Sequence, residues 1–223
     1  MPHLDRDGDV FILDLGDGEN RFNPEWVGAV TAEIDRVAST PGPKALVTAA
    51  RGKFWSNGLD LDWMGAHPDE AGPFLDSVHE LFARVLTLPL PTVAAIQGHA
   101  FAAGAMLALA HDQRVMRADR GFFCLPEVDI HIPFTMGMSE LIRSRLPVRA
   151  AHEAMTTGRR YGGTDALAAE IVDAVADEGK VLATAVEIVR PLAGKASEVL
   201  GTIKSRLYSD AVAALRAEQG RRG

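Results

Sequence analysis

The segment from Thr92 to Ala110 is the most apolar stretch of the chain, and it restricts the folds that the chain can adopt. It is almost long enough to span a bilayer, which takes about 20 apolar residues in a helix. Polar and glycine residues at 97–99 and Gly104 interrupt it, however, and leave a run of strand length followed by a run of helix length. We therefore expect a buried strand, a turn and a buried helix, and no association with a membrane.

Runs typical of strands and runs typical of helices alternate along the first part of the chain. Residues 9–15 are a short apolar run that predicts a strand, and a Gly-Asp-Gly turn follows it. Asn23-Pro24 combines an N-cap with a proline at the first helical position, and a helical face of apolar residues comes next. This alternation predicts an α/β fold with a parallel sheet. From about residue 138 the pattern is mostly helical, with a short strand possible at 171–175.

The composition limits the partners and the compartment. The 223 residues suit one domain, or one domain with a small appendage. The net charge of -7 argues against nucleic acid as a partner, because phosphate binding needs clustered Lys and Arg. The single cysteine, Cys124, excludes an intrachain disulfide and fits a reducing compartment. The first residues show neither the basic nor the apolar region of a signal peptide, so we expect a cytoplasmic protein. The seven histidines lack the spacing of a metal site, and no metal is expected.

Two segments share one layout, in which an apolar strand leads through a turn of small residues into a helix. The first turn is Phe54–Leu61 (FWSNGLDL), and the second is Gly98–Gly104 (GHAFAAG). The start of a helix carries unpaired N–H groups and the positive end of the helix dipole, and small residues let a ligand approach that backbone. Two such turns facing each other could supply two N–H donors to one oxygen, which is an oxyanion hole. Taken alone, glycine turns of this kind more often serve packing.

Three ordered motifs resemble the crotonase (enoyl-CoA hydratase/isomerase) superfamily. They are Lys53–Leu61 (KFWSNGLDL), Pro91–Arg114 and Asp119–Pro133 (DRGFFCLPEVDIHIP). The first and third are similar in particular to plant-type Δ3,Δ2-enoyl-CoA isomerases, although His131 stands where those proteins usually have glycine. The resemblance implies a crotonase-like ββα spiral core with an acyl-CoA site in residues 1–137. It also implies a helical trimerisation region in residues 138–223, assembling a homotrimer or a dimer of trimers.

The resemblance further implies roles for single residues. The backbone N–H groups of Asn57 and Ala103 would form the oxyanion hole, and Glu127 would be the one catalytic acid/base. The residues expected to contact the substrate or its coenzyme A part are Ser56, Gly58, Leu61, Gly104 and Met106. From the residues alone, a surface position for Glu127 is the commoner outcome, because charged side chains are seldom buried. An apolar pocket would instead raise its pKa towards a value useful for catalysis.

Met106 separates the reactions that such a site could catalyse. Hydratases of this family carry a second glutamate at the matching position, and adding water across a conjugated thioester commonly uses two carboxylates. Moving a double bond needs only one base and an oxyanion hole. We therefore expect an isomerase that converts a 3-enoyl-CoA to the conjugated 2-enoyl-CoA through an enolate. Coenzyme A would be part of the substrate, and no separate cofactor is expected.

Three alternatives to the isomerase stay open, because a fold does not choose among the reactions that it can host. The first is a hydratase that works with Glu127 alone. The second is another crotonase reaction, such as thioester hydrolysis or decarboxylation. The third is a catalytically silent protein that binds acyl-CoA without turnover.

Overall fold

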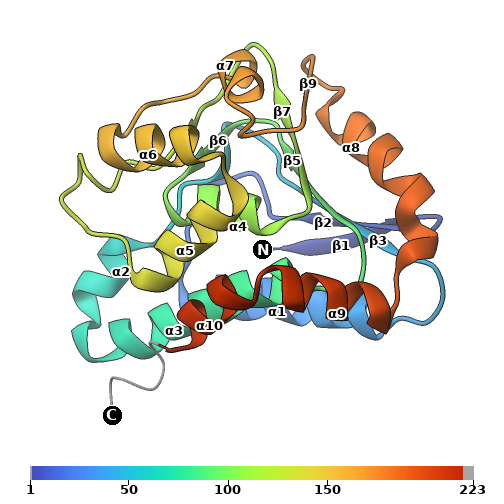
Figure 1. The fold of residues 1–223 in the computed structure, drawn as a ribbon, viewed down its shortest axis with the longest axis horizontal. Helices are drawn as coiled ribbons and strands as arrows, with labels where there is room; N and C mark the ends of the chain where they lie inside the picture. The colour runs from blue at the N-terminus through green and yellow to red at the C-terminus, as the bar shows by residue number, and fades with distance from the viewer. Residues whose placement is uncertain (1, 218–223) are drawn as a thin grey trace.

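The computed structural model describes residues 2–217, which fold around a large mixed sheet and a small parallel sheet (Figure 1). The large sheet has the strand order β1-β2-β3-β5-β7-β9, and within it β1 and β2 pair in antiparallel fashion whereas the other neighbours are parallel. The small sheet has the order β4-β6-β8. The strands of the large sheet are β1 His3–Asp7, β2 Val10–Asp14, β3 Ala45–Ala49, β5 Thr92–Ile96, β7 Gln113–Arg117 and β9 Ala174–Ala176, and those of the small sheet are β4 Phe54–Ser56, β6 His99–Phe101 and β8 Phe123–Cys124.

The core is built from a unit that visits both sheets before it enters a helix. Strand β3 leads through β4 to α2 and α3, β5 leads through β6 to α4, and β7 leads through β8 and a loop to α5. These helices are α2 Leu61–Ala66, α3 Pro68–Leu86, α4 Ala103–Ala110 and α5 Met136–Arg145. The predicted ββα arrangement is therefore present. Because β4, β6 and β8 are neighbours, the segments that leave them meet at one end of the small sheet, and these segments hold both glycine turns and Glu127.

The helices of the first half form where the sequence pattern places them. Helix α1, Pro24–Ser39, begins at the predicted cap, where the Asn23 side chain accepts a hydrogen bond from the Trp26 N–H at 2.9 Å. Every residue of α4 is buried, as expected for so apolar a helix. Within residues 2–217, we find no helix that is both long and apolar enough to cross a bilayer.

Residues 138–217 do not form a separate helical layer, which corrects the predicted division after residue 137. Strand β9 overlaps the end of the short strand predicted at 171–175 and pairs with β7 in the large sheet, and α8 (Val181–Val189) packs on β3, β5 and β7 of that sheet. The predicted boundary is wrong because β9 and α8, which complete the core, lie after residue 137 in the chain. The remaining elements of this region are α6 Val148–Thr157, α7 Gly163–Ala168, α8 Val181–Val189, a 3-10 helix Arg190–Lys195, α9 Glu198–Leu207 and α10 Ser209–Ala217.

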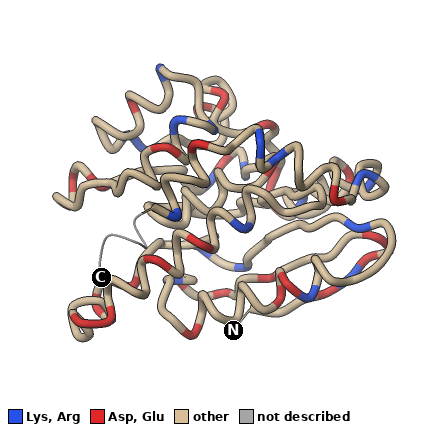
Figure 2. The backbone as a smooth tube through the Cα atoms, turned by 60° about the horizontal axis from the view of Figure 1, so that its bottom comes forward, with Lys and Arg blue, Asp and Glu red and all other residues tan. Residues whose placement is uncertain are grey.

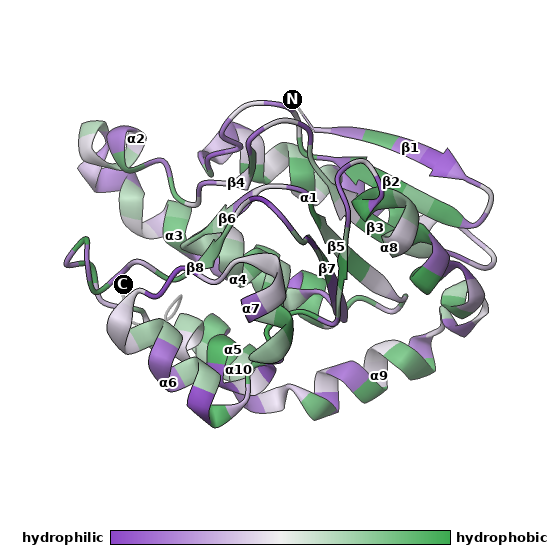
Figure 3. Cartoon of the chain, turned by 90° about the horizontal axis from the view of Figure 1, so that it is seen from above, coloured by the Kyte–Doolittle hydropathy of each residue, from purple (hydrophilic) through white to green (hydrophobic). Residues whose placement is uncertain are grey.

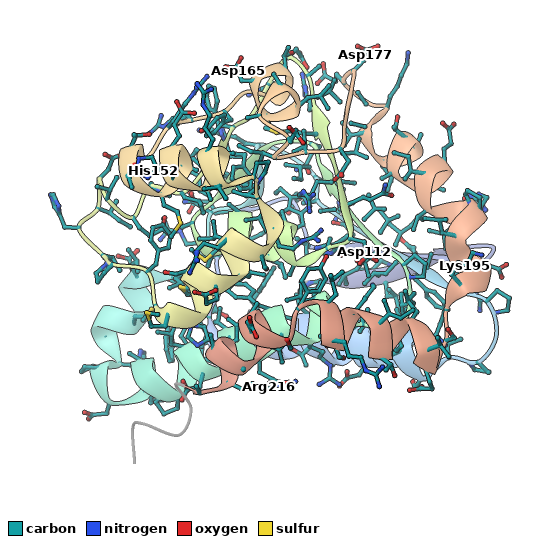
Figure 4. All side chains as sticks on the ribbon, viewed as in Figure 1. Asp112, His152, Asp165, Asp177, Lys195 and Arg216 are labelled. Carbon is teal, nitrogen blue, oxygen red and sulfur yellow. The ribbon has the colours of Figure 1, made fainter. Side chains whose placement is uncertain are left out.

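The last helices fold back on their own chain. Helix α10 packs on α3 and α5, and Gly137 of α5 lies against Leu215, where an added Cβ would come within 2.7 Å of the Leu215 backbone. Charged residues of both signs are mixed along the chain (Figure 2), and some of them tie these helices down. Arg216 of α10 binds both carboxylate oxygens of Glu80 on α3 at 2.9 Å, and buried Lys204 of α9 binds Asp112 at 2.6 Å. Figure 4 labels Arg216 and Asp112.

Candidate active site

The two glycine turns touch each other through their glycines. Gly58 has a φ of +81°, and an added Cβ would lie 2.9 Å from the Phe101 carbonyl oxygen. Gly104 packs on Ser56 so closely that a Cβ there would lie 2.7 Å from its side chain. The Ser56 hydroxyl is itself used within the first turn, because it donates to the Asn20 carbonyl oxygen and accepts from the Gly58 N–H. These small residues therefore let two helix starts approach within contact distance.

The N–H that the first turn leaves free belongs to Leu59, not to Asn57. The Asn57 N–H donates to the Glu19 carbonyl oxygen at 2.9 Å, so the prediction that it serves as an oxyanion donor is wrong for this structure. Phe22 forms a parallel bridge with Leu59. The Phe22 N–H donates to the Gly58 carbonyl oxygen, and the Phe22 carbonyl oxygen accepts from the Asp60 N–H, at 2.8 Å in both cases. In such a bridge the N–H of the central residue points away from the neighbouring segment. Among the described residues we find no acceptor for the Leu59 N–H.

The second turn presents the N–H of Ala103 from a strained backbone. Ala103 is the first residue of α4, where helical N–H groups have no acceptor within the helix. Ala102 before it has φ +50° and ψ -125°, a conformation that costs a residue other than glycine about 1–3 kcal/mol. The Ala102 N–H donates to the Cys124 carbonyl oxygen at 3.0 Å, and its carbonyl oxygen accepts from Met106 at 3.1 Å. Strand β8 and the first turn of α4 thus hold the second donor in place.

Glu127 lies three residues beyond β8 and is buried. Only 7% of its surface is exposed, and its Oε2 has no hydrogen-bond partner among the described residues. Burial raises its pKa from 4.5 to about 7, which is a suitable value for a base that works near neutral pH. The alternative of a surface carboxylate is therefore excluded by its position.

One cavity of about 420 Å³ brings these groups together. Its wall includes Leu59, Ala103 and Glu127, so the residues that carry the two free N–H groups and the buried carboxyl group border the same space. Hollows of similar or larger size lie elsewhere on the surface, but none of those described contains both turns and Glu127. An electron-rich oxygen held by the two N–H groups would sit within reach of a single base, which is the arrangement that enolate chemistry requires.

The other predicted contact residues divide into two groups. Leu61 and Met106 line the cavity, and so does Asn57. Ser56, Gly58 and Gly104 do not line it, and they form the contact between the two turns instead. Sequence reasoning assigned them to the ligand because it could not distinguish small residues that face a ligand from small residues that face each other.

The cavity wall also includes residues outside the predicted set of contact residues. Ile130, Ile132 and Met138 supply apolar surface from the segment between β8 and α5 and from α5 itself. Their signal in the sequence is the alternation of apolar residues after Glu127. At the other end Arg21 lines the cavity and pairs with Asp62 at 3.0 Å.

His131 lies between these isoleucines and has a φ of +58°, a left-handed conformation that favours glycine. The glycine usual in plant-type isomerases thus has a backbone reason. Among the described residues no group of His, Cys, Asp and Glu side chains is arranged to hold a metal ion.

Comparison with known proteins decides the family. The sequence profile of the enoyl-CoA hydratase/isomerase family matches residues 10–221. The chain belongs to the enoyl-CoA hydratase/isomerase family. It is 38% identical to the peroxisomal enoyl-CoA delta isomerase 2 of Arabidopsis thaliana over 94% of this chain and 93% of that protein. It is also 38% identical to enoyl-CoA delta isomerase 3 of the same plant, with the same coverage of both chains.

Solved structures of this family share the fold. A protein of Mycobacterium tuberculosis that is described both as an enoyl-CoA isomerase and as a probable enoyl-CoA hydratase superposes with a TM-score of 0.87 at 30% identity, covering 97% of this chain and 95% of that one. Human mitochondrial Δ3,Δ2-enoyl-CoA isomerase superposes with a TM-score of 0.90 at 23% identity, covering 98% of this chain and 87% of that one, which shows the fold alone. The crotonase fold predicted from the three motifs is therefore confirmed.

Proposed function

We propose that this protein is an enoyl-CoA isomerase that moves the double bond of a 3-enoyl-CoA into conjugation with the thioester. The Glu127 carboxylate takes a proton from C2, and the electrons of that C–H bond delocalise onto the thioester oxygen. The N–H groups of Leu59 and Ala103 hold the resulting enolate. The protonated Glu127 then returns the proton at C4 as the double bond forms between C2 and C3. The balance requires neither water nor a redox partner.

The observation that carries this proposal is that Glu127 is the one buried carboxyl group of the cavity described above. Met106, at the position where the hydratases of the family have a second glutamate, is 1% exposed and cannot activate water. Asp62 also belongs to the wall, but its side chain is 92% exposed and pairs with Arg21. One base and two N–H donors suffice to isomerise, whereas hydration commonly uses two carboxylates. The names of the Arabidopsis relatives, enoyl-CoA delta isomerases, support the same choice.

The experiment is to incubate the protein with a 3-enoyl-CoA and follow the ultraviolet absorbance of the conjugated thioester, with Glu127→Gln beside it. The isomerase is supported if the absorbance rises with the parent and if the rate of that rise is at least about a hundredfold lower with the variant, since general acid–base catalysis contributes about 10²–10⁴-fold. Formation of a 3-hydroxyacyl-CoA from a 2-enoyl-CoA would favour a hydratase. Release of free coenzyme A or of carbon dioxide would favour the other reactions of the family. Tight binding of the 3-enoyl-CoA without any product would indicate the silent binder.

We further propose that the protein assembles as a homotrimer or a dimer of trimers. Helix α9 presents three exposed apolar residues, Val199, Ile203 and Leu207, at a spacing of four that places them on one face. A face of this kind supports an interface between copies of the chain. Light scattering in solution tests it, and a monomeric mass would refute it.

Coenzyme A as part of the substrate, rather than a separate cofactor, follows from the proposed reaction. Arg21, which lines the cavity, would meet its charged part in this proposal. The cytoplasmic location stays a prediction, and two of the Arabidopsis relatives are named as peroxisomal.

A further inference from the structure

One edge of the cavity is apolar and yet exposed. Leu61 at the start of α2 is 44% exposed, Ile130 is 43% exposed and Ile132 is 40% exposed, and all three line the cavity. We call these three residues the rim. Ile130 and Ile132 lie on the loop between β8 and α5, where hydrophobic stretches alternate with hydrophilic ones (Figure 3). Apolar side chains left in water beside a binding cavity indicate a surface that an apolar ligand covers.

The floor of the cavity offers no path for an acyl chain. Met106 and Met138 line the cavity on the side of the protein interior, since both are buried in the main hydrophobic core. Behind Met106 every residue of α4 is buried as well. Protein interiors are packed at crystal density, so a chain of more than a few carbons could enter there only by displacing core side chains.

The charged part of the cavity wall is equally unsuited to an acyl chain. Arg21 and Asp62 form an ion pair there, and Glu19 also binds Arg21 at 2.5 Å. An acyl chain lying across these groups would bury charge without offering it a hydrogen bond, which is unfavourable. The rim is therefore the apolar route that this cavity offers from the reacting carbons to the surface.

The segments that carry the rim touch the main core at few points, among them Trp63 and Met64 of α2. Helix α2 has no buried residue, and its Trp63 contacts the neighbouring helix through rings of His67 and Phe74. All residues at 128–133 are exposed. Acyl chains of different length can thus lie between α2 and this loop while Glu127 and both turns stay fixed.

We propose that the acyl tail of the substrate leaves the cavity over the rim, and that Leu61, Ile130 and Ile132 give the enzyme a preference for long acyl chains. This inference rests on the proposed isomerase. A methylene group that is fully removed from water gains about fourfold in affinity, and one that is half covered gains about twofold. Half covering all six methylenes between a six-carbon and a twelve-carbon substrate would raise kcat/KM by about sixtyfold, and half covering three of them would raise it by about tenfold, which is the least that we expect.

The test compares the ratio of kcat/KM for twelve-carbon and six-carbon 3-enoyl-CoA in three proteins. The double variant Ile130→Ser/Ile132→Ser should lower that ratio about tenfold. The matched control is Val128→Ser, because Val128 lies on the same loop and is also 43% exposed but does not line the cavity. Its ratio should equal that of the parent. All three positions are exposed, so the variants should fold like the parent.

A parent ratio near one, or a ratio that falls equally in the double variant and in Val128→Ser, would overturn the inference. Affinity for saturated acyl-CoA, measured by calorimetry, separates this result from a failure of the isomerase. If no chain length is isomerised, the proposed function fails. The inference about the rim is then tested by binding alone. It is supported if twelve-carbon acyl-CoA binds about tenfold tighter than six-carbon acyl-CoA and the double variant loses that difference, and it is refuted otherwise.

Discussion

Replacing Glu127 by Gln should make the fold more stable at alkaline pH while it removes the base. Burial raises the pKa of Glu127 in the folded protein from 4.5 to about 7, whereas the unfolded chain keeps the ordinary value. The folded state therefore holds its proton more tightly than the unfolded state. The stabilisation that follows is complete below about pH 4.5 and is lost as the pH rises through about 7. Gln has nearly the same shape and never ionises, so it should escape this loss.

The size of the effect follows from the two pKa values. A shift of about 2.5 units corresponds to about 3 kcal/mol once the pH is well above 7. Between about pH 5 and about pH 8 the parent should lose about 2.5 kcal/mol of unfolding free energy relative to Glu127→Gln. A constant offset from the buried amide cancels in this comparison, because it is the same at both values of pH.

Urea unfolding of both proteins at the two values of pH measures this difference directly. Asp62→Asn is the control, because it removes a carboxylate from the same cavity wall where the side chain is 92% exposed and already solvated. It should follow the parent. If the gap between Glu127→Gln and the parent is the same at both values of pH, the carboxyl group is not desolvated in the folded protein and the reasoning fails.

Four further predictions follow from the site. The kcat/KM of the parent for a 3-enoyl-CoA should rise with pH through a midpoint near 7, because Glu127 must be ionised to accept the proton, and a pH–rate profile measures it. Met106→Glu should move that midpoint to higher pH in the same profile, because a second carboxylate in the cavity disfavours the first. Ala102→Gly should raise the unfolding free energy in urea by about 1 kcal/mol, because relief of the positive φ outweighs the entropy of glycine. Gly104→Ala should lower it by about 1–3 kcal/mol and reduce kcat, because the added Cβ meets Ser56 at 2.7 Å and separates the two turns.

The local elements of the fold were predictable because their causes are local. The strand and buried helix between Thr92 and Ala110 follow from an apolar run interrupted by glycine, and the structure has β5, β6 and α4 there. The start of α1 follows from one cap residue, Asn23. Glu127 followed from the family motif, and its burial confirms that it faces a pocket rather than solvent.

The features that the sequence could not predict depend on contacts between distant segments. Residues 19–22 run beside the first turn and decide which of its N–H groups is free. They accept hydrogen bonds from the N–H groups of Asn57 and Asp60 and leave that of Leu59 without an acceptor. Strand β1 is exposed along most of its length, so it lacks the apolar run that predicts a strand. The return of β9 to the large sheet likewise depends on its pairing with β7, far away in the chain.

Buried charged groups behave differently inside and outside the cavity, and this difference locates the chemistry. Arg114 is buried with partners, since its side chain binds Asp173 at 3.0 Å and the Ile171 carbonyl oxygen at 2.7 Å. Lys204 is likewise bound to Asp112. Glu127 is buried without a hydrogen bond at Oε2, and it lies beside a backbone at Ala102 that costs energy to hold.

Packing requires neither the strained backbone at Ala102 nor the unpaired carboxyl oxygen of buried Glu127. A glycine at 102 and an apolar residue at 127 would satisfy the fold at a lower cost. Local rules are broken where function needs a strained or uncompensated group. The strain at Ala102 fixes the direction of the Ala103 N–H, and the unpaired oxygen of Glu127 stays free to accept a proton at one carbon and return it at another. A carboxylate held in place by hydrogen bonds, as the side chains of Arg114 and Lys204 are, could not move from the first carbon to the second.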